Sequence, residues 1–312
     1  MQFLAHIPTA IINNIGFMAI LFILYETYKY IWVTTPNHLY KLATAFELLG
    51  LFHFVITFYL LTNNTIRITN TIVPIHFQIQ EITDYLPYIG FAYFLLLLFF
   101  IVKTGSQFKI ISKYKQTADF TVATQWNSLL KEAYNTKLDY KIGYSAYIQN
   151  PITFGWLDPV ILLPIAITNQ LTVDEIKLIL LHEIAHIVRN DYFIHVIMET
   201  SHKFLYFNPF SYLLMNEISV QREMACDDWV IKQTNTPIVY TKALYNIAAT
   251  SIVNAKQNLY LGAINNNSDL LKRIKQIHKM EHKSAKQYAI SVLMAGIGIC
   301  LLLMPNFYLH KQ

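Results

Sequence analysis

Charged residues and cysteines are both scarce in this sequence. Only 14% of the 312 residues are charged and 54% are hydrophobic, a balance outside the usual range of soluble globular proteins. The two cysteines, Cys226 and Cys300, are too few for a disulfide framework. No lysine or arginine precedes the first apolar run, so we expect that run to be a membrane span and not a cleaved signal peptide. The composition therefore indicates an integral membrane protein.

Four apolar stretches are close to the length of about 20 helical residues that a bilayer requires. They cover approximately residues 7–25, 42–61, 86–102 and 288–304. Asn13, Asn14 and Glu47 interrupt the first two stretches. Polar side chains within spans usually face other helices, so we expect these three to point into the bundle.

Basic residues predict how the chain is oriented in the membrane. Four lysines follow the third stretch: Lys103, Lys109, Lys113 and Lys115. Six further basic residues between Lys272 and Lys286 precede the fourth stretch, and both groups belong on the cytoplasmic side by the positive-inside rule. We therefore expect three transmembrane helices in residues 1–104 with the N-terminus outside, a cytosolic domain and linker in 105–286, and a fourth span with a short external tail in 287–312. Membrane flanking accounts for the basic clusters, so we expect membrane lipid as a partner and no direct nucleic-acid binding.

The pattern His182-Glu183-x-x-His186 lies in the middle of a predicted helix over residues 172–191. Residues four apart share a helix face, so His182 and His186 can bind one metal ion with Glu183 beside them. Zn²⁺ suits imidazole ligands, and a catalytic site needs three protein ligands and an open position for water. Glu183 is placed to take the proton of that water, so the pattern indicates a zinc hydrolase.

A third ligand is expected on a second predicted helix, Ser211 to about Lys232. Glu223 and Asp227 are four apart on it, so one carboxylate could bind the metal while the other holds a ligand histidine. A solvated acidic helix face would give the same spacing. Glu217 and Glu199 are alternative ligands, although neither has a second acid four residues later.

The rest of the expected domain combines helices with a small sheet. Aromatic and β-branched runs predict strands at residues 140–148, 152–156 and 160–163, and residues 120–134 have the spacing of an amphipathic helix. The strand at 152–156, if it lies at an edge, could pair with an extended substrate. Thr172 and Glu175 have capping-box spacing at the start of the histidine helix. Later, Asn265–Ser268 predicts a loop, followed by a basic amphipathic helix.

Three stretches together resemble the BlaR/MecR-type membrane sensor-transducer metallopeptidases, which are gluzincins. Residues 151–164 match the family signature Pro-x-x-x-Gly-x-x-x-Pro-x-Ile-x-Leu-Pro. His182-Glu183-x-x-His186 is followed by Arg189 and Asp191, as in the family, and Glu223-x-x-x-Asp227 matches its Glu-x-x-x-Asp pattern.

The resemblance implies an α-helical membrane protein with an inserted α+β gluzincin-like zinc metallopeptidase domain. It implies zinc ligands at His182, His186 and Glu223, a general base at Glu183, and a role for Asp227 in orienting a ligand. Candidates for stabilising the oxyanion remain open: His202, Tyr192, Tyr206 and Tyr212. The resemblance also implies cleavage of the chain itself, within the linker at about 254–287, and of a cytosolic regulatory protein such as a transcriptional repressor.

Two other functions compete with a signal-transducing zinc endopeptidase. One is a prenyl-protein-processing or quality-control membrane protease, which shares the His-Glu pattern, and the other is a signalling scaffold without catalysis. The β-lactam-sensing members continue into an extracellular penicillin-binding domain, whereas this chain ends within a few residues of Pro305. We therefore expect either a relative without that sensor or a truncated chain, and antibiotic resistance does not follow from the resemblance.

Overall fold

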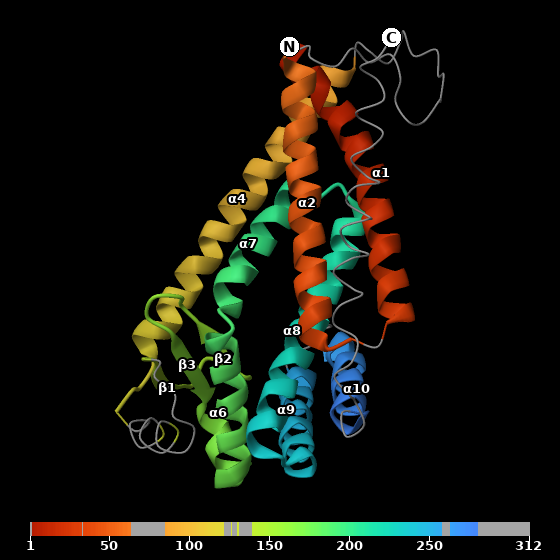
Figure 1. The fold of residues 1–312 in the computed structure, drawn as a ribbon. Helices are drawn as coiled ribbons and strands as arrows, with labels where there is room; N and C mark the ends of the chain where they lie inside the picture. The colour runs from red at the N-terminus through yellow and green to blue at the C-terminus, as the bar shows by residue number, and fades with distance from the viewer. Residues whose placement is uncertain are drawn as a thin grey trace.

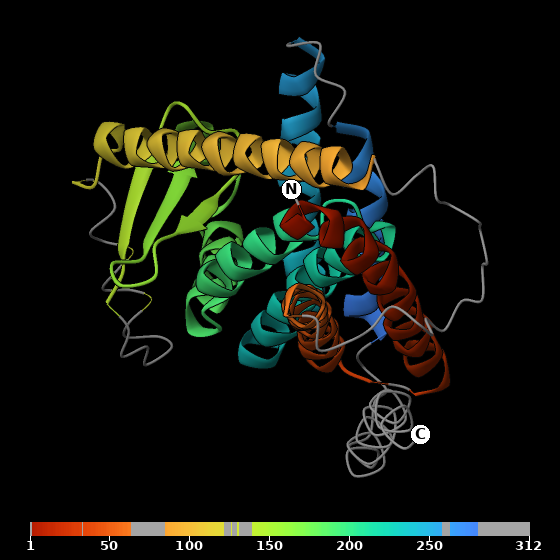
Figure 2. The ribbon, with the colours of Figure 1, turned by 90° about the horizontal axis from the view of Figure 1, so that it is seen from above.

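The structure is a computed structural model that describes residues 2–32, 34–63, 85–121, 126, 130, 139–257 and 263–279. It is mostly helical, with one small sheet to one side of the helices (Figures 1 and 2). The predicted span over residues 288–304, Cys300 and most of the predicted helix over 120–134 lie outside the described residues. The arrangement confirms the predicted class, a helical membrane protein with an inserted α+β domain.

Among the described residues, three helices are long and apolar enough to cross a membrane: α1 (Gln2–Ile31), α2 (Pro36–Thr62) and α4 (Leu86–Thr117). Each is longer than the apolar stretch that predicted it. The additional turns of α4 follow Lys103 and extend beside the sheet (Figure 2). There Ile111 and Tyr114 pack against Phe154 and Val160, so α4 connects the spans to the domain.

Helices α7 (Asp191–Phe204) and α8 (Pro209–Thr234) form a hairpin whose tip packs among the spanning helices (Figure 1). Buried Met198, Leu214 and Ile218 share one apolar cluster with side chains of α1, α2 and α4. The sequence pattern did not predict this contact, because α7 is too short to register as a span.

Polar side chains also hold this hairpin in the bundle. The Asn208 amide donates to the side-chain oxygen of Asn14 at 2.8 Å, and the Ser211 hydroxyl donates to Glu47 at 2.6 Å. Asn14 and Glu47 are fully buried, which confirms that they face the bundle interior, while Asn13 is half-buried. Hydrogen bonds between helices satisfy polar groups that water cannot reach.

The sheet has the strand order β1-β3-β2, with β1 (Lys141–Ser145) parallel and β2 (Ile152–Phe154) antiparallel to β3 (Val160–Pro164). The three predicted strands are confirmed, each at or within its predicted run apart from the last residue of β3. β2 lies at an edge of the sheet, as the substrate-pairing hypothesis requires. A 3-10 helix, η1 (Ile165–Asn169), leads from β3 to the next helix.

Helix α6 (Val173–Val188) carries the His-Glu pattern. The Thr172 hydroxyl accepts from the backbone N–H of Glu175 at 3.3 Å, and the Glu175 carboxylate accepts from the Thr172 backbone N–H at 2.9 Å. This confirms the predicted capping box. The helix ends before the predicted Asp191 because Asn190 adopts the left-handed conformation, with φ 55°, and separates α6 from α7.

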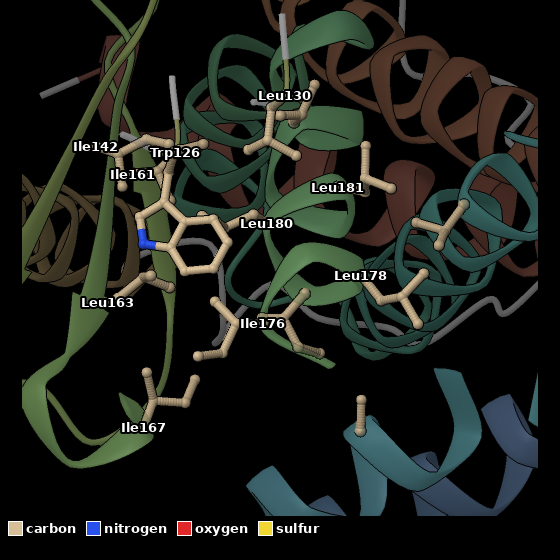
Figure 3. Close-up of a cluster of buried hydrophobic side chains, with 14 of the residues drawn as sticks. Trp126, Leu130, Ile142, Ile161, Leu163, Ile167, Ile176, Leu178, Leu180 and Leu181 are labelled. Carbon is tan, nitrogen blue, oxygen red and sulfur yellow. The ribbon is translucent and has the colours of Figure 1, made fainter. Parts of the chain in front are cut away.

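One apolar cluster fixes α6 against the sheet (Figure 3). Ile142, Ile161 and Leu163 from the strands lie on one side, and Ile176 and Leu180 from α6 lie on the other. Each fully buried aliphatic side chain contributes about 1.5–3 kcal/mol, so the His-Glu pattern is held on a rigid element.

Helices α9 (Pro237–Gln257) and α10 (Ala263–Lys279) complete the domain. The predicted loop at Asn265–Ser268 is wrong, because these residues lie within the first turns of α10. Asn and Ser are favoured near helix N-termini, and the apolar face of α10, with Leu270 and Ile277, packs on the core. The basic amphipathic helix predicted after that loop is confirmed.

Candidate metal centre

Helix α6 presents both histidines of the His-Glu pattern on one face. His182 and His186 are one helical turn apart, and their ring centroids are 4.9 Å apart with nearly perpendicular planes. His182 and Glu183 are buried, and the side chain of His186 is 15% exposed. The pair therefore faces a site that is shielded but not sealed.

Helix α8 brings Glu223 to this pair. Its carboxylate oxygens lie 3.3 Å from Nε2 of His182 and 3.8 Å from Nε2 of His186. The three residues can each offer one ligand atom, and these atoms all lie within 4.8 Å of one another. Two imidazole nitrogens and one carboxylate oxygen form a donor set that suits a divalent metal such as zinc.

The alternative third ligands lie elsewhere. Glu217 accepts from the ammonium group of Lys29 on α1 at 2.7 Å, and Glu199 is paired with Lys203 at 3.7 Å. Among the described residues, Glu223 is the only glutamate that forms a possible metal-binding group with both histidines.

The second ring nitrogen of His182 faces a buried polar group. The Tyr240 hydroxyl lies 2.8 Å from Nδ1 of His182 and donates to the Asp227 carboxylate at 2.6 Å. Arg273 on α10 donates to both oxygens of Asp227, at 2.7 and 2.8 Å. A hydroxyl that donates to Asp227 must accept from His182, which places the proton of a neutral His182 on Nδ1 and leaves Nε2 free for a metal.

The charges of Asp227, Arg273 and His182 stabilise one another. Burial opposes ionisation of Asp227, but the Arg273 guanidinium outweighs burial and lowers the pKa of the carboxyl. Burial likewise opposes protonation of His182, but hydrogen bonds to Asp227 and Glu223 raise its pKa to about 9. A metal at Nε2 of His182 would replace the proton that these carboxylates favour.

The second nitrogen of His186 is held separately. Nδ1 lies 2.8 Å from Asp191, which also accepts from Nε of Arg189 at 3.0 Å. Burial opposes ionisation of Asp191, but His186 and Arg189 lower the pKa of the carboxyl. The Cys226 thiol lies 3.3 Å from both His186 and Asp191. His186, Asp191 and Cys226 could also surround a metal, but Asp191 already pairs with Arg189, so we interpret them as supports for His186.

Glu183 is anchored by the edge strand. The hydroxyl of Thr153 on β2 donates to Oε2 of Glu183 at 2.6 Å. The carboxylate on α6 is thereby connected to the strand that a substrate could extend.

The comparisons with known proteins agree with this geometry. A family model described as BlaR1 peptidase M56 matches residues 53–277, more than half of the chain. The chain belongs to the BlaR1 peptidase M56 family. This match confirms the predicted family resemblance. M56 peptidases are metallopeptidases.

Two kinds of relative are similar to this M56 chain. The "Methicillin resistance mecR1 protein" of Staphylococcus aureus strain Mu50, and that of Staphylococcus epidermidis, are 25% identical over 227 residues, which are 70% of this chain and 38% of each relative. "Regulatory protein BlaR1" of Bacillus licheniformis is 38% identical over 88 residues, which are 28% of this chain and 14% of that protein. The chain thus spans less than two fifths of the length of these relatives.

Several residues considered from the sequence lie away from the metal centre of this M56 chain. His202 contacts the Ser211 hydroxyl at 2.8 Å, and Tyr206 stacks on Tyr93 of α4, both within the helical bundle. Conversely, Tyr240 and Arg273 belong to the site although no sequence motif includes them. Tyr240 offered no recognisable signal, whereas Arg273 lies between Leu270 and Ile277 on the apolar face of α10, a spacing that favours a buried ion pair.

Proposed function

We propose that this chain is a membrane zinc endopeptidase with a signalling role. The observation that carries the proposal is the convergence of Nε2 of His182, Nε2 of His186 and the Glu223 carboxylate. The opposite ring nitrogens are held by the Tyr240 hydroxyl and the Asp191 carboxylate. Open, three-ligand sites of this kind are typical of catalytic zinc, whereas structural zinc sites are usually closed by four protein ligands.

The surrounding residues have distinct roles in the proposed hydrolysis. A bound zinc ion would supply Lewis acidity and lower the pKa of water. Glu183 would accept a proton from the attacking water and deliver it to the leaving amine, with Thr153 fixing the direction of its carboxylate. β2 pairs only with β3 among the described strands, so its other edge could bind an extended peptide through main-chain hydrogen bonds.

The membrane setting narrows the choice of substrate. The lysines that follow the third span favour a catalytic domain on the cytoplasmic side, with the N-terminus outside. The proposed substrates are therefore this chain itself and a cytosolic regulatory protein such as a transcriptional repressor. One relative is named a regulatory protein, which supports a signalling role over general protein processing.

The test combines zinc analysis with a cleavage assay on the detergent-purified chain. We expect roughly one zinc per wild-type chain after dialysis, loss of zinc in Glu223→Ala, and full retention in the control Glu199→Ala. Glu183→Gln should retain zinc but show no cleavage of a peptide library or of its own linker by mass spectrometry.

Each departure from these results has a distinct meaning. A folded wild-type chain without zinc would favour the scaffold hypothesis. Zinc retained in Glu223→Ala would assign the third ligand to another residue, and cleavage by Glu183→Gln would exclude Glu183 as the base.

A further inference from the structure

The turn that follows β2 exposes large apolar side chains. Trp156 is 56% exposed and Leu157 is 86% exposed, although both belong to the folded domain. Gly155 has φ 89°, and a Cβ at this position would lie 2.6 Å from the carbonyl oxygen of Asp158. The backbone is therefore tightly folded at Gly155, and the two side chains after it project outward. Exposed tryptophan and leucine side by side are unfavourable in water.

This turn contacts the base of α7. The Trp156 ring packs edge-on against Phe193 with centroids 4.7 Å apart, and Phe193 is itself 40% exposed. On the opposite side, Asp158 accepts from Lys115 of α4 at 2.8 Å. The apolar turn thus lies between two helices that both continue into the spanning bundle.

The depth of the turn can be estimated along these helices. The Tyr93 hydroxyl of α4 donates to the carbonyl of Phe204 at the end of α7, so the two helices are in contact at this level. Phe193 lies about eleven residues back along α7, roughly 16 Å at the helical rise. On α4 the turn lies at the level of Ile111 to Lys115, because Lys115 donates to Asp158; these residues belong to the lysine-bearing turns that follow the apolar run.

Basic side chains of α4 lie along the part of the helix that passes the turn. Lys103, Lys109 and Lys113 are exposed on α4. A tryptophan near the end of a span, with lysines around it, is the usual composition of the zone where lipid headgroups meet the acyl chains. The lysines would attract anionic headgroups while the apolar side chains enter the boundary.

We propose that the 155–158 turn, together with Phe193, inserts into the anionic lipid headgroup layer at the lysine-bearing end of the spans. Insertion covers the exposed Trp156 and Leu157 and holds β2 beside the bilayer surface. If the proposed peptidase function is correct, a substrate strand that pairs with β2 then lies next to the membrane.

A nitroxide spin label at Leu157→Cys tests the insertion directly. The label is read in nanodiscs of phosphatidylcholine and phosphatidylglycerol, in the full chain with Cys300→Ala, while the buried Cys226 is retained. The matched control is Tyr147→Cys, because Tyr147 is 63% exposed in the same domain. Tyr147 follows Ser145, the last residue of β1, which pairs with Pro164 at the end of β3. The 155–158 turn precedes Val160 at the start of β3, so the two labels lie at opposite ends of this parallel strand pair.

The measurement compares relaxation of the label by oxygen, which concentrates in acyl chains, and by a water-soluble nickel chelate. The label at 157 should be relaxed severalfold more by oxygen relative to nickel than the label at 147. Equal accessibility of both labels to nickel would overturn the proposal, because the turn would then lie in water. Protection of the label at 157 from both reagents would also overturn it and would show that protein, such as a second copy, covers the turn. These results do not depend on peptidase activity, so failure of the insertion is distinguishable from failure of the proposed function.

Discussion

Replacing Arg273 by methionine should destabilise the domain through the charge that it leaves behind. The guanidinium donates to both oxygens of Asp227, whose side chain is only 1% exposed. Removing one partner of a buried ion pair typically costs 3–5 kcal/mol, because the other charge remains buried without its counter-ion. Tyr240 and His182 still contact Asp227, so we expect the lower end, about 3 kcal/mol, which lowers Tm by roughly 6–12 °C in a domain of this size.

The assay is thermal unfolding of chelator-treated protein in nanodiscs, so that metal affinity does not enter the comparison. The matched control is Lys272→Met on the same helix, which also removes one positive charge. Lys272 is more than half exposed and pairs with Asp269 at the surface, so its loss should cost less than about 1 kcal/mol.

A double-mutant cycle separates the charge effect from general damage to α10. Asp227→Asn should be destabilising in the wild-type background but nearly neutral, or stabilising, after Arg273→Met, with a coupling of about 2 kcal/mol. The reasoning is refuted if Arg273→Met unfolds at the same temperature as Lys272→Met, or if the two effects simply add.

Two further substitutions test the contacts around the α6 side chains. Tyr240→Phe removes the hydroxyl 2.8 Å from Nδ1 of His182 and should weaken zinc binding about 10-fold in competition with a chromophoric chelator, while exposed Tyr245→Phe on the same helix should have no effect. Thr153→Val removes the hydrogen bond to Glu183 and should lower kcat about 10-fold with zinc content unchanged; unaltered turnover would mean that the base does not need this anchor.

Local patterns predicted the parts of this chain that depend on neighbouring residues. The sequence predicted the capping box at Thr172, the His-Glu spacing on α6 and the short strands. Each depends on helical or strand periodicity over a few neighbouring residues. The convergence of Glu223 with the histidines was expected from its carboxylate pair and from the family resemblance.

Long-range contacts account for what was missed. Tyr240 and Arg273 reach the same carboxylate from α9 and α10, 13 and 46 residues away in the chain. The position of Arg273 on the apolar face of α10 marks it as a buried charge but does not identify Asp227 as its partner. The sequence pattern also does not reveal that the tip of the α7–α8 hairpin packs among the spanning helices, through Asn208 and buried Met198 and Leu214. Hydropathy registers a whole span of about 20 residues, and α7 falls below that length.

The spanning helices contact the supports of the metal centre at the start of α2. Arg189 donates to Asn37 at 2.7 Å and lies over the ring of Tyr40, and it also holds the Asp191 carboxylate that faces His186. Only two side chains therefore separate α2 from a histidine of the metal centre.

A second connection runs through α8. Lys29, near the end of α1, pairs with Glu217 at 2.7 Å, and Glu217 precedes Glu223 by six residues, about 9 Å along one continuous helix. Contacts from α1 and α2 thus reach α8, which carries Glu223, and Arg189, which holds the partner of His186. The candidate site therefore combines two histidines on α6, which packs on the sheet, with a glutamate on α8, which packs against the spanning helices.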